Sequence, residues 1–115
     1  MRYGLIGYPL GHSFSPLLHR RLADIDYELF PLPEEQFEAF MAARDFSAVN
    51  VTIPYKQRVL PYCDRLIPAA QRCGGVNLLK KERDGTLTGD NTDLAGLTFL
   101  LRQNGWELTG KTVVI

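Results

Sequence analysis

A lysine and an aspartate are the residues of this sequence best suited to acid–base chemistry. Lys56 follows the segment N-V-T-I-P-Y at residues 50–55, and Asp93 ends the segment G-D-N-T-D at residues 89–93. A lysine can give a proton to an oxygen that gains negative charge, and a carboxylate can orient the lysine. By position alone each has a simpler interpretation. Lys56 would be a solvated surface residue, and Asp93 would be favoured at the N-terminus of a helix that Thr92 caps.

Two serines, Ser13 and Ser15, stand where Ser15-Pro16 predicts the start of a helix. Helix N-termini carry unpaired N–H groups, so two hydroxyls at this place are suited to bind a small carboxylate. The alternative is that Ser15 only caps the helix and that Ser13 is solvated. We interpret His12 as a loop residue and His19 as a helix-surface residue, rather than as ligands or bases.

Amide and hydroxyl side chains come from two further places. Asn50 and Thr52 lie on the same side of a predicted strand, because alternate strand residues share a face. Asn77 follows two glycines, and it could bind a hydroxyl or only stabilise a turn. Asp90 and Asp93 lack the histidine or further acidic partners that a cation site needs, so no metal site is predicted.

Alternating strands and helices must position these residues. Apolar runs predict strands at residues 3–8, 27–32 and 48–53, with helices that begin at Ser15 and Pro33 and a helical turn after Pro54. Pro61 and Pro68 delimit short helical pieces, Asp84-Gly85 predicts a hairpin, and a helix is expected at residues 92–103. The alternation predicts an α/β fold, a mostly parallel sheet with helices on both faces in a three-layer sandwich with right-handed crossovers.

The overall composition excludes several classes of partner. Lys plus Arg and Asp plus Glu each number 13, so the net charge of zero argues against nucleic acid or an anionic membrane as a partner. The apolar runs are too short for a signal peptide or for a membrane helix of about 18 residues, and we expect a cytoplasmic protein. In that reducing compartment Cys63 and Cys73 are expected to be free thiols.

Four motifs occur in an order that resembles the shikimate dehydrogenase family: H-S-x-S-P at residues 12–16, N-V-T-x-P-x-K at 50–56, G-x-V-N at 74–77 and G-x-N-T-D at 89–93. The resemblance implies the N-terminal substrate-binding domain of an enzyme that reduces 3-dehydroshikimate to shikimate with NADPH in aromatic amino-acid biosynthesis. It implies Lys56 and Asp93 as the catalytic pair. It also implies that the substrate is bound by Ser13, Ser15, Thr52, Lys56, Asn77 and Asp93.

The resemblance further implies a boundary near the end of the sequence. Residues 1–105 would form the substrate-binding domain, and residues 106–115 a linker and the first strand of a Rossmann domain that is missing. NADP is then expected to bind only the full-length enzyme, and the isolated chain is expected to be inactive. Gly75 and Leu94 depart mildly from the family pattern, which has alanine and often glycine there.

Two alternatives stay open at this point. The chain could be a stand-alone, non-catalytic module that binds shikimate or quinate, and the sequence does not distinguish these two ligands. An unpaired apolar strand at residues 112–115 could also promote association into a homodimer.

Overall fold

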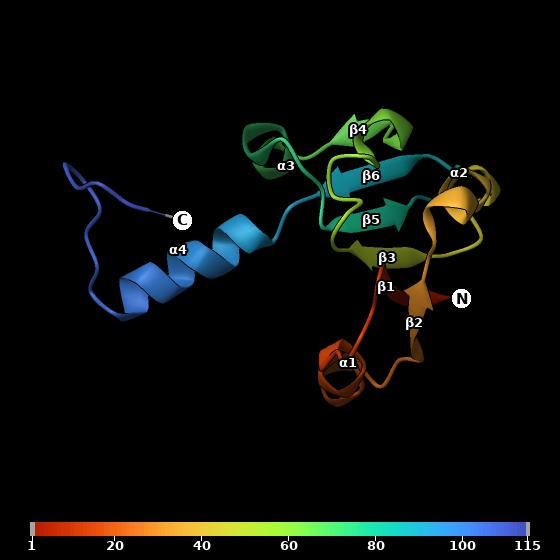
Figure 1. The fold of residues 1–115 in the computed structure, drawn as a ribbon, viewed down its shortest axis with the longest axis horizontal. Helices are drawn as coiled ribbons and strands as arrows, with labels where there is room; N and C mark the ends of the chain where they lie inside the picture. Colours follow the sequence, from red (N-terminus) through yellow and green to blue (C-terminus); the bar gives the residue numbers. More distant parts are fainter. Residues whose placement is uncertain (1, 115) are drawn as a thin grey trace.

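The computed structural model describes residues 2–114 and is built around one six-stranded sheet (Figure 1). The strand order across the sheet is β2-β1-β3-β5-β6-β4. In chain order the elements are β1 (Tyr3–Gly7), α1 (Ser15–Ala23), β2 (Tyr27–Pro31), α2 (Glu34–Ala43), β3 (Ala48–Val51), the 3₁₀ helix η1 (Leu60–Tyr62), β4 (Arg65–Leu66), α3 (Pro68–Cys73), β5 (Leu78–Lys81), β6 (Leu87–Asp90) and α4 (Asp93–Gln103).

The sheet is mixed, so the prediction of a mostly parallel sheet holds only in part. β1 pairs in parallel with β2 and β3, and β4 pairs in parallel with β6. The pairs β3–β5 and β5–β6 are antiparallel. The hairpin was predicted, and its two strands must run antiparallel because the connecting turn is short. The two-residue strand β4 was not predicted, since so short a segment gives no alternating pattern.

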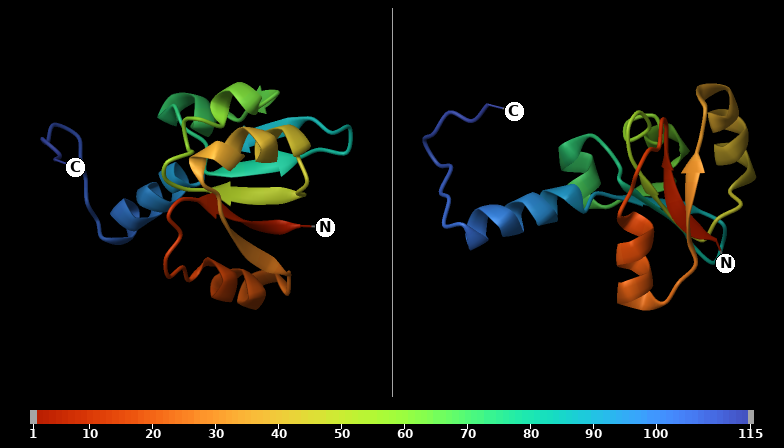
Figure 2. Two further views of the ribbon diagram at one scale, coloured as in Figure 1. Left: turned by 45° about the vertical axis from the view of Figure 1, so that its right-hand side comes forward. Right: turned by 60° about the horizontal axis from the view of Figure 1, so that its bottom comes forward.

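The helices cover the sheet unequally. α1 and α2 lie on opposite sides of β1 and β2 (Figure 2), as right-handed crossovers in opposite directions require. α2 buries Phe37 and Met41, whereas α1 buries no residue. α4 extends away from the sheet (Figure 1), and Phe99 of this helix is 61% exposed. The three-layer sandwich is therefore formed only in part.

The main core lies between the sheet and α2. It contains strand residues such as Val49 and Val51, and Phe37, whose ring stacks on that of Tyr55 with 4.5 Å between centroids. Because strand side chains alternate, burial of Val49 and Val51 on this face turns Asn50 to the other face. The apolar pattern of β3 thereby positions a polar side chain on the α1 side of the sheet.

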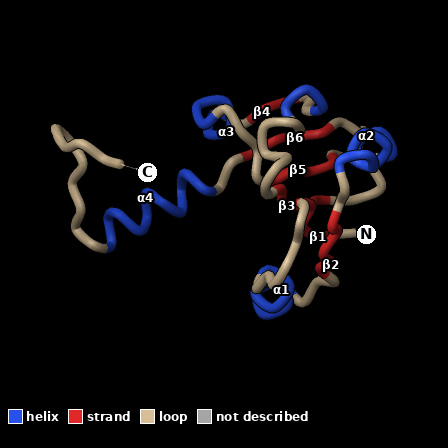
Figure 3. The backbone as a smooth tube through the Cα atoms, viewed as in Figure 1, coloured by secondary structure: helices blue, strands red, loops and turns tan. Residues whose placement is uncertain are grey.

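The sequence also made predictions for the two cysteines and for the last residues of the chain. Cys63 and Cys73 are free thiols, as predicted, and burial raises the pKa of Cys63 to about 11. Residues 106–114 form turns and irregular structure (Figure 3), so the strand predicted at residues 112–115 is not formed over its described part. A strand needs a hydrogen-bonded neighbour, and no strand pairs with this segment among residues 2–114. Ile115 lies outside the described residues, and the assignment of residues 106–115 to a second domain stays a prediction.

The sequence also predicted that the apolar runs are too short for a membrane helix. Within residues 2–114, no helix has the length and the apolar character needed to cross a bilayer.

Candidate active site

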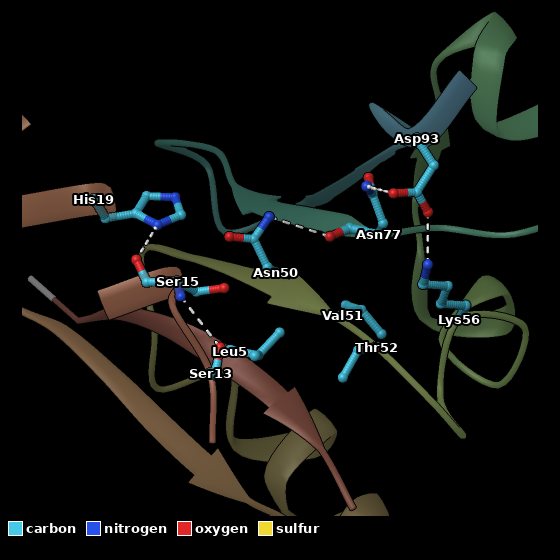
Figure 4. A pocket seen from close by; sticks show the side chains of 10 residues that line it. All are labelled: Leu5, Ser13, Ser15, His19, Asn50, Val51, Thr52, Lys56, Asn77 and Asp93. Carbon is cyan, nitrogen blue, oxygen red and sulfur yellow. Dashed lines mark hydrogen bonds and ion pairs between the residues drawn. The ribbon is translucent and has the colours of Figure 1, made fainter. Parts of the chain in front are cut away.

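A polar pocket of about 370 Å³ lies on the side of β1 and β3 where α1 is placed (Figure 4). All six side chains that the sequence singled out for binding line this pocket. The lining residues are Leu5, Ser13, Ser15, His19, Asn50, Val51, Thr52, Lys56, Asn77 and Asp93. Residues from β1 to the first turn of α4 therefore meet at one place, although Leu5 and Asp93 are 88 positions apart in the sequence.

Lys56 and Asp93 form an ion pair at one end of the pocket. The Lys56 Nζ donates to the Asp93 Oδ2 over 2.6 Å, and the two side chains are 37% and 56% exposed, so a ligand can reach both. The helical turn predicted after Pro54 is instead a series of turns, and the first helical residues come at η1. Lys56 is fixed there because its carbonyl accepts the Val76 N–H over 2.8 Å.

Asn77 holds the aspartate in place from behind. Its Nδ2 donates to the Asp93 Oδ1 over 3.0 Å and to the Thr92 Oγ1 over 2.8 Å. Its Oδ1 accepts the Thr92 N–H over 2.9 Å. With 8% exposure, the Asn77 side chain is largely engaged within the protein, and one Oδ1 lone pair remains for a ligand hydroxyl. Asn77 thus does more than stabilise a turn.

Asn91 is a supporting residue that the sequence reasoning missed. Its Oδ1 accepts the N–H groups of Asp93 and Leu94 over 3.0 and 3.4 Å, and its Nδ2 donates to the Gly75 carbonyl over 3.0 Å. Asn91 therefore caps α4, whereas Thr92, which the sequence favoured as the cap, makes no side-chain cap contact. The signal was present, because asparagine is a strong capping residue.

The two serines lie at the opposite end of the pocket. The Ser13 Oγ accepts the Ser15 N–H over 3.2 Å, so Ser13 makes the contact with the helix start that the sequence assigned to Ser15. α1 begins at Ser15 itself, and both side chains line the pocket. Because Ser13 uses only a lone pair in this contact, its O–H stays available as a donor to a ligand.

His19 and Asn50 also line the pocket, although neither was assigned to the site. The His19 Nδ1 lies 2.8 Å from the Ser15 carbonyl oxygen, and the ring stacks on Tyr27 with 4.0 Å between centroids. His19 is thus more than a helix-surface residue. Its spacing of four from Ser15 places both on one helix face, which was the available signal.

Asn50 is fixed from both ends of its amide group. The Tyr27 hydroxyl donates to the Asn50 Oδ1 over 2.7 Å, and the Asn50 Nδ2 donates to the Asn77 carbonyl over 3.3 Å. Burial raises the pKa of Tyr27 to about 12, partly offset by a hydrogen bond with Ser15, so this phenol is a neutral donor. The strand alternation that groups Asn50 with Thr52 was the signal for this residue.

The arrangement offers proton transfer and hydrogen bonding to a small polar ligand. An exposed lysine–aspartate pair stands at one end, hydroxyl donors stand at the other, and amides lie between them. Among residues 2–114, no group of three or more His, Cys, Asp and Glu side chains is placed to hold a metal ion.

Known proteins are similar to this chain in sequence and in fold. A family model described as the shikimate dehydrogenase substrate binding domain matches residues 5–79. The chain is 49% identical to a shikimate dehydrogenase (NADP(+)) of Oleidesulfovibrio alaskensis over 90% of its own length and 39% of that protein, and 38% identical to one of Shewanella halifaxensis over 99% and 44%. The chain spans less than half of the length of these curated relatives.

Solved structures give the same result. The chain superposes on shikimate dehydrogenase 1 from Peptoclostridium difficile with a TM-score of 0.85, at 34% identity, over 94% of this chain and 43% of the other. It also superposes on shikimate 5-dehydrogenase from Thermus thermophilus, a structure in complex with NADP(H) and shikimate, with a TM-score of 0.79, at 33% identity, over 94% and 44%.

Proposed function

The chain belongs to the family of shikimate dehydrogenase substrate-binding domains, and we propose that it binds shikimate and 3-dehydroshikimate and performs the proton transfer of their NADP-dependent interconversion. The observation that carries this proposal is the exposed Lys56–Asp93 pair, 2.6 Å between Nζ and Oδ2, at one end of a pocket whose other end holds two serines. The reaction belongs to aromatic amino-acid biosynthesis, and we propose that the protein acts in the cytoplasm.

The pocket offers a partner for each polar group of such a ligand. The hydroxyls of Ser13 and Ser15 bind the substrate carboxylate, and Thr52 and Asn77 bind ring hydroxyls near the ion pair. This orientation brings the reacting oxygen of the substrate to Lys56. A small hydroxylated acid thereby spans the pocket from the serines to the lysine.

Lys56 acts as the proton donor in the direction of reduction. The carbonyl oxygen of 3-dehydroshikimate gains negative charge as the carbonyl is reduced, and an ammonium within hydrogen-bond reach stabilises and then protonates it. Asp93 orients the ammonium, and Asn77 orients Asp93 through its 3.0 Å contact. In the direction of oxidation the step runs in reverse, and the neutral amine of Lys56 takes up the proton of the shikimate hydroxyl.

The residues that line this pocket do not themselves fit NADP. A dinucleotide is bound by a glycine-rich turn that brings backbone N–H groups to its phosphates. No glycine lines this pocket, and its one lysine is paired with Asp93. The proposal therefore assigns substrate binding and proton transfer to this chain. We expect no turnover by the 115-residue chain alone.

Calorimetric titration of the chain with shikimate and with quinate tests the binding role. We expect saturable binding of shikimate and weaker binding of quinate, and a Ser15→Ala variant should lose affinity for shikimate. No binding of shikimate would sink the proposal, and equal binding of both ligands would contradict the choice of shikimate. Formation of NADPH from shikimate and NADP⁺ by the isolated chain, followed by absorbance, would contradict the expected inactivity.

The catalytic role needs a full-length enzyme that contains this chain. There, a Lys56→Ala change should lower kcat about a hundredfold or more, the usual range for loss of a general acid, and should alter KM much less. If only KM changed, Lys56 would be a binding residue. Unaltered shikimate binding by a chain that never supports turnover would favour the alternative of a non-catalytic binding module.

A further inference from the structure

One wall of the pocket, formed by His19 of α1 and Tyr27 of β2, has no role in the proton transfer described above. The two rings stack with 4.0 Å between centroids and an angle of 11° between their planes. Tyr27 is 5% exposed, so the platform under the imidazole is fixed by packing. His19 itself is accessible and lines the pocket beside Ser13 and Ser15 (Figure 4).

The contacts of the imidazole leave one nitrogen for a ligand. The Nδ1 lies 2.8 Å from the Ser15 carbonyl oxygen, which can only accept, so Nδ1 carries the hydrogen. Nε2, on the other side of the ring, makes no hydrogen bond within the described residues. The ring is therefore oriented by two independent contacts, and its free nitrogen is turned away from the helix backbone.

The charge distribution of the pocket gives this nitrogen a partner. Three titratable side chains line the pocket, and two of them, Lys56 and Asp93, neutralise each other. His19 is the third, and it stands at the serine end. In a second cleft that His19 lines, the other titratable side chains are the phenols of Tyr3 and Tyr27, and neither is a carboxylate. An anionic group at the serines would find in His19 the one side chain there that can become cationic.

We propose that His19 is a further substrate-contacting residue, which takes up a proton on Nε2 when the ligand binds and donates a charge-assisted hydrogen bond to the ligand carboxylate. Tyr27 is its positioning residue, because its ring holds the imidazole and its hydroxyl ties β2 to Asn50 over 2.7 Å. This inference rests on the proposed function, since it concerns the carboxylate of the same ligand.

Calorimetry with shikimate and with its methyl ester tests the contact. Hydrogen bonds to charged groups are strong, so the change His19→Phe, which keeps a ring on Tyr27, should weaken shikimate binding about tenfold. Binding of the uncharged ester should change less than twofold, because the ester carries no carboxylate charge. Tyr27→Phe should have a smaller effect of the same selectivity, and His12→Phe, which replaces the other histidine outside the pocket, should have none.

Proton uptake on shikimate binding distinguishes a direct contact by His19 from a purely structural role of this residue, because a structural role would not change it. At pH 7, titrations in phosphate and in Tris should give different binding enthalpies for the wild type, because binding takes up a proton, and this difference should vanish in His19→Phe. The ¹⁵N resonance of Nε2 should shift on addition of shikimate to the wild type, which tests the contact even if a variant folds poorly.

The outcomes separate the two proposals. If the wild type does not bind shikimate, the proposed function itself fails. If it binds, but His19→Phe keeps full affinity or loses affinity for acid and ester alike, only the role of His19 is overturned.

Discussion

The two ends of the pocket are held by different kinds of structure. The end with Lys56 and Asp93 is joined by side-chain hydrogen bonds between separate segments, through Asn77 and Asn91, which are 8% and 7% exposed. The end with the serines belongs to a single segment that leads into α1, a helix that buries none of its residues. One end is thus braced by buried amides, and the other depends on the contacts of a few side chains with β2 and β3.

This difference has a functional meaning. A proton donor must hold its distance to the reacting oxygen closely, and the interlocked amides provide that constraint. A carboxylate can be bound by several donors that adjust together. The serine end of the pocket can therefore be held less rigidly by the rest of the fold. The comparison predicts that substitutions behind Asp93 cost more folding free energy than substitutions behind Ser15.

The largest effect is expected for Asn77→Ala. The change removes a buried amide that accepts the Thr92 N–H and donates to Thr92 Oγ1 and Asp93 Oδ1, so the free energy of unfolding should fall by about 3 kcal/mol. Urea denaturation followed by circular dichroism measures it. Asn104→Ala is the matched control, because that exposed amide contacts only the Leu100 carbonyl of its own helix. A loss below about 1 kcal/mol would show that the ends are not braced differently.

The next largest effect is expected for Asn91→Ala. This change should lower the free energy of unfolding by about 2 kcal/mol, because it removes the cap of α4 and a buried contact with Gly75. Hydrogen exchange should quicken most at the amides of Asp93 and Leu94. The matched variant Thr92→Ala should leave these two amides protected, since Thr92 does not cap the helix. Faster exchange of both amides in Thr92→Ala than in Asn91→Ala would reverse the assignment.

The capping of α4 also illustrates what sequence patterns predict and where they end. The resemblance of the four ordered motifs to a known family implied that Ser13, Lys56 and Asp93 share one site, whereas local spacing alone left each of them with a structural interpretation. Sequence patterns favoured Thr92 over Asn91 as the cap, since either residue suits that position. The choice is made by Asn77, which engages the Thr92 hydroxyl from fifteen residues away.

The fold shows the same limit. Strand positions and the hairpin followed from local apolar patterns, but the antiparallel pairing of β5 with β3 depends on a contact between distant segments. Leu18 and Leu22 of α1 have the spacing of an apolar helix face, yet they are 55% and 81% exposed. Periodicity shows that a helix has an apolar side and does not show what lies against that side.

A smaller effect tests the serine end directly. Tyr27→Phe removes the donor to the Asn50 Oδ1 and keeps the ring under His19, so the unfolding free energy should fall by about 1 kcal/mol. Tyr8→Phe, at a tyrosine that is 48% exposed, is the control and should change little. In a double-mutant cycle with Asn50→Ala, the two changes should be strongly non-additive. Full additivity would mean that the Tyr27 hydroxyl does not hold Asn50.

The smallest expected effect concerns a single proton at the same end. Because the Ser15 carbonyl can only accept, neutral His19 should carry its hydrogen on Nδ1 and leave Nε2 bare. Long-range ¹H–¹⁵N spectra at about pH 9, above the usual range for imidazole titration, distinguish the two tautomers. His12, on the same chain, serves as the internal comparison. If His19 carried its hydrogen on Nε2, the ring would not be tied to α1, and the serine end would lose one of the two contacts that orient its histidine.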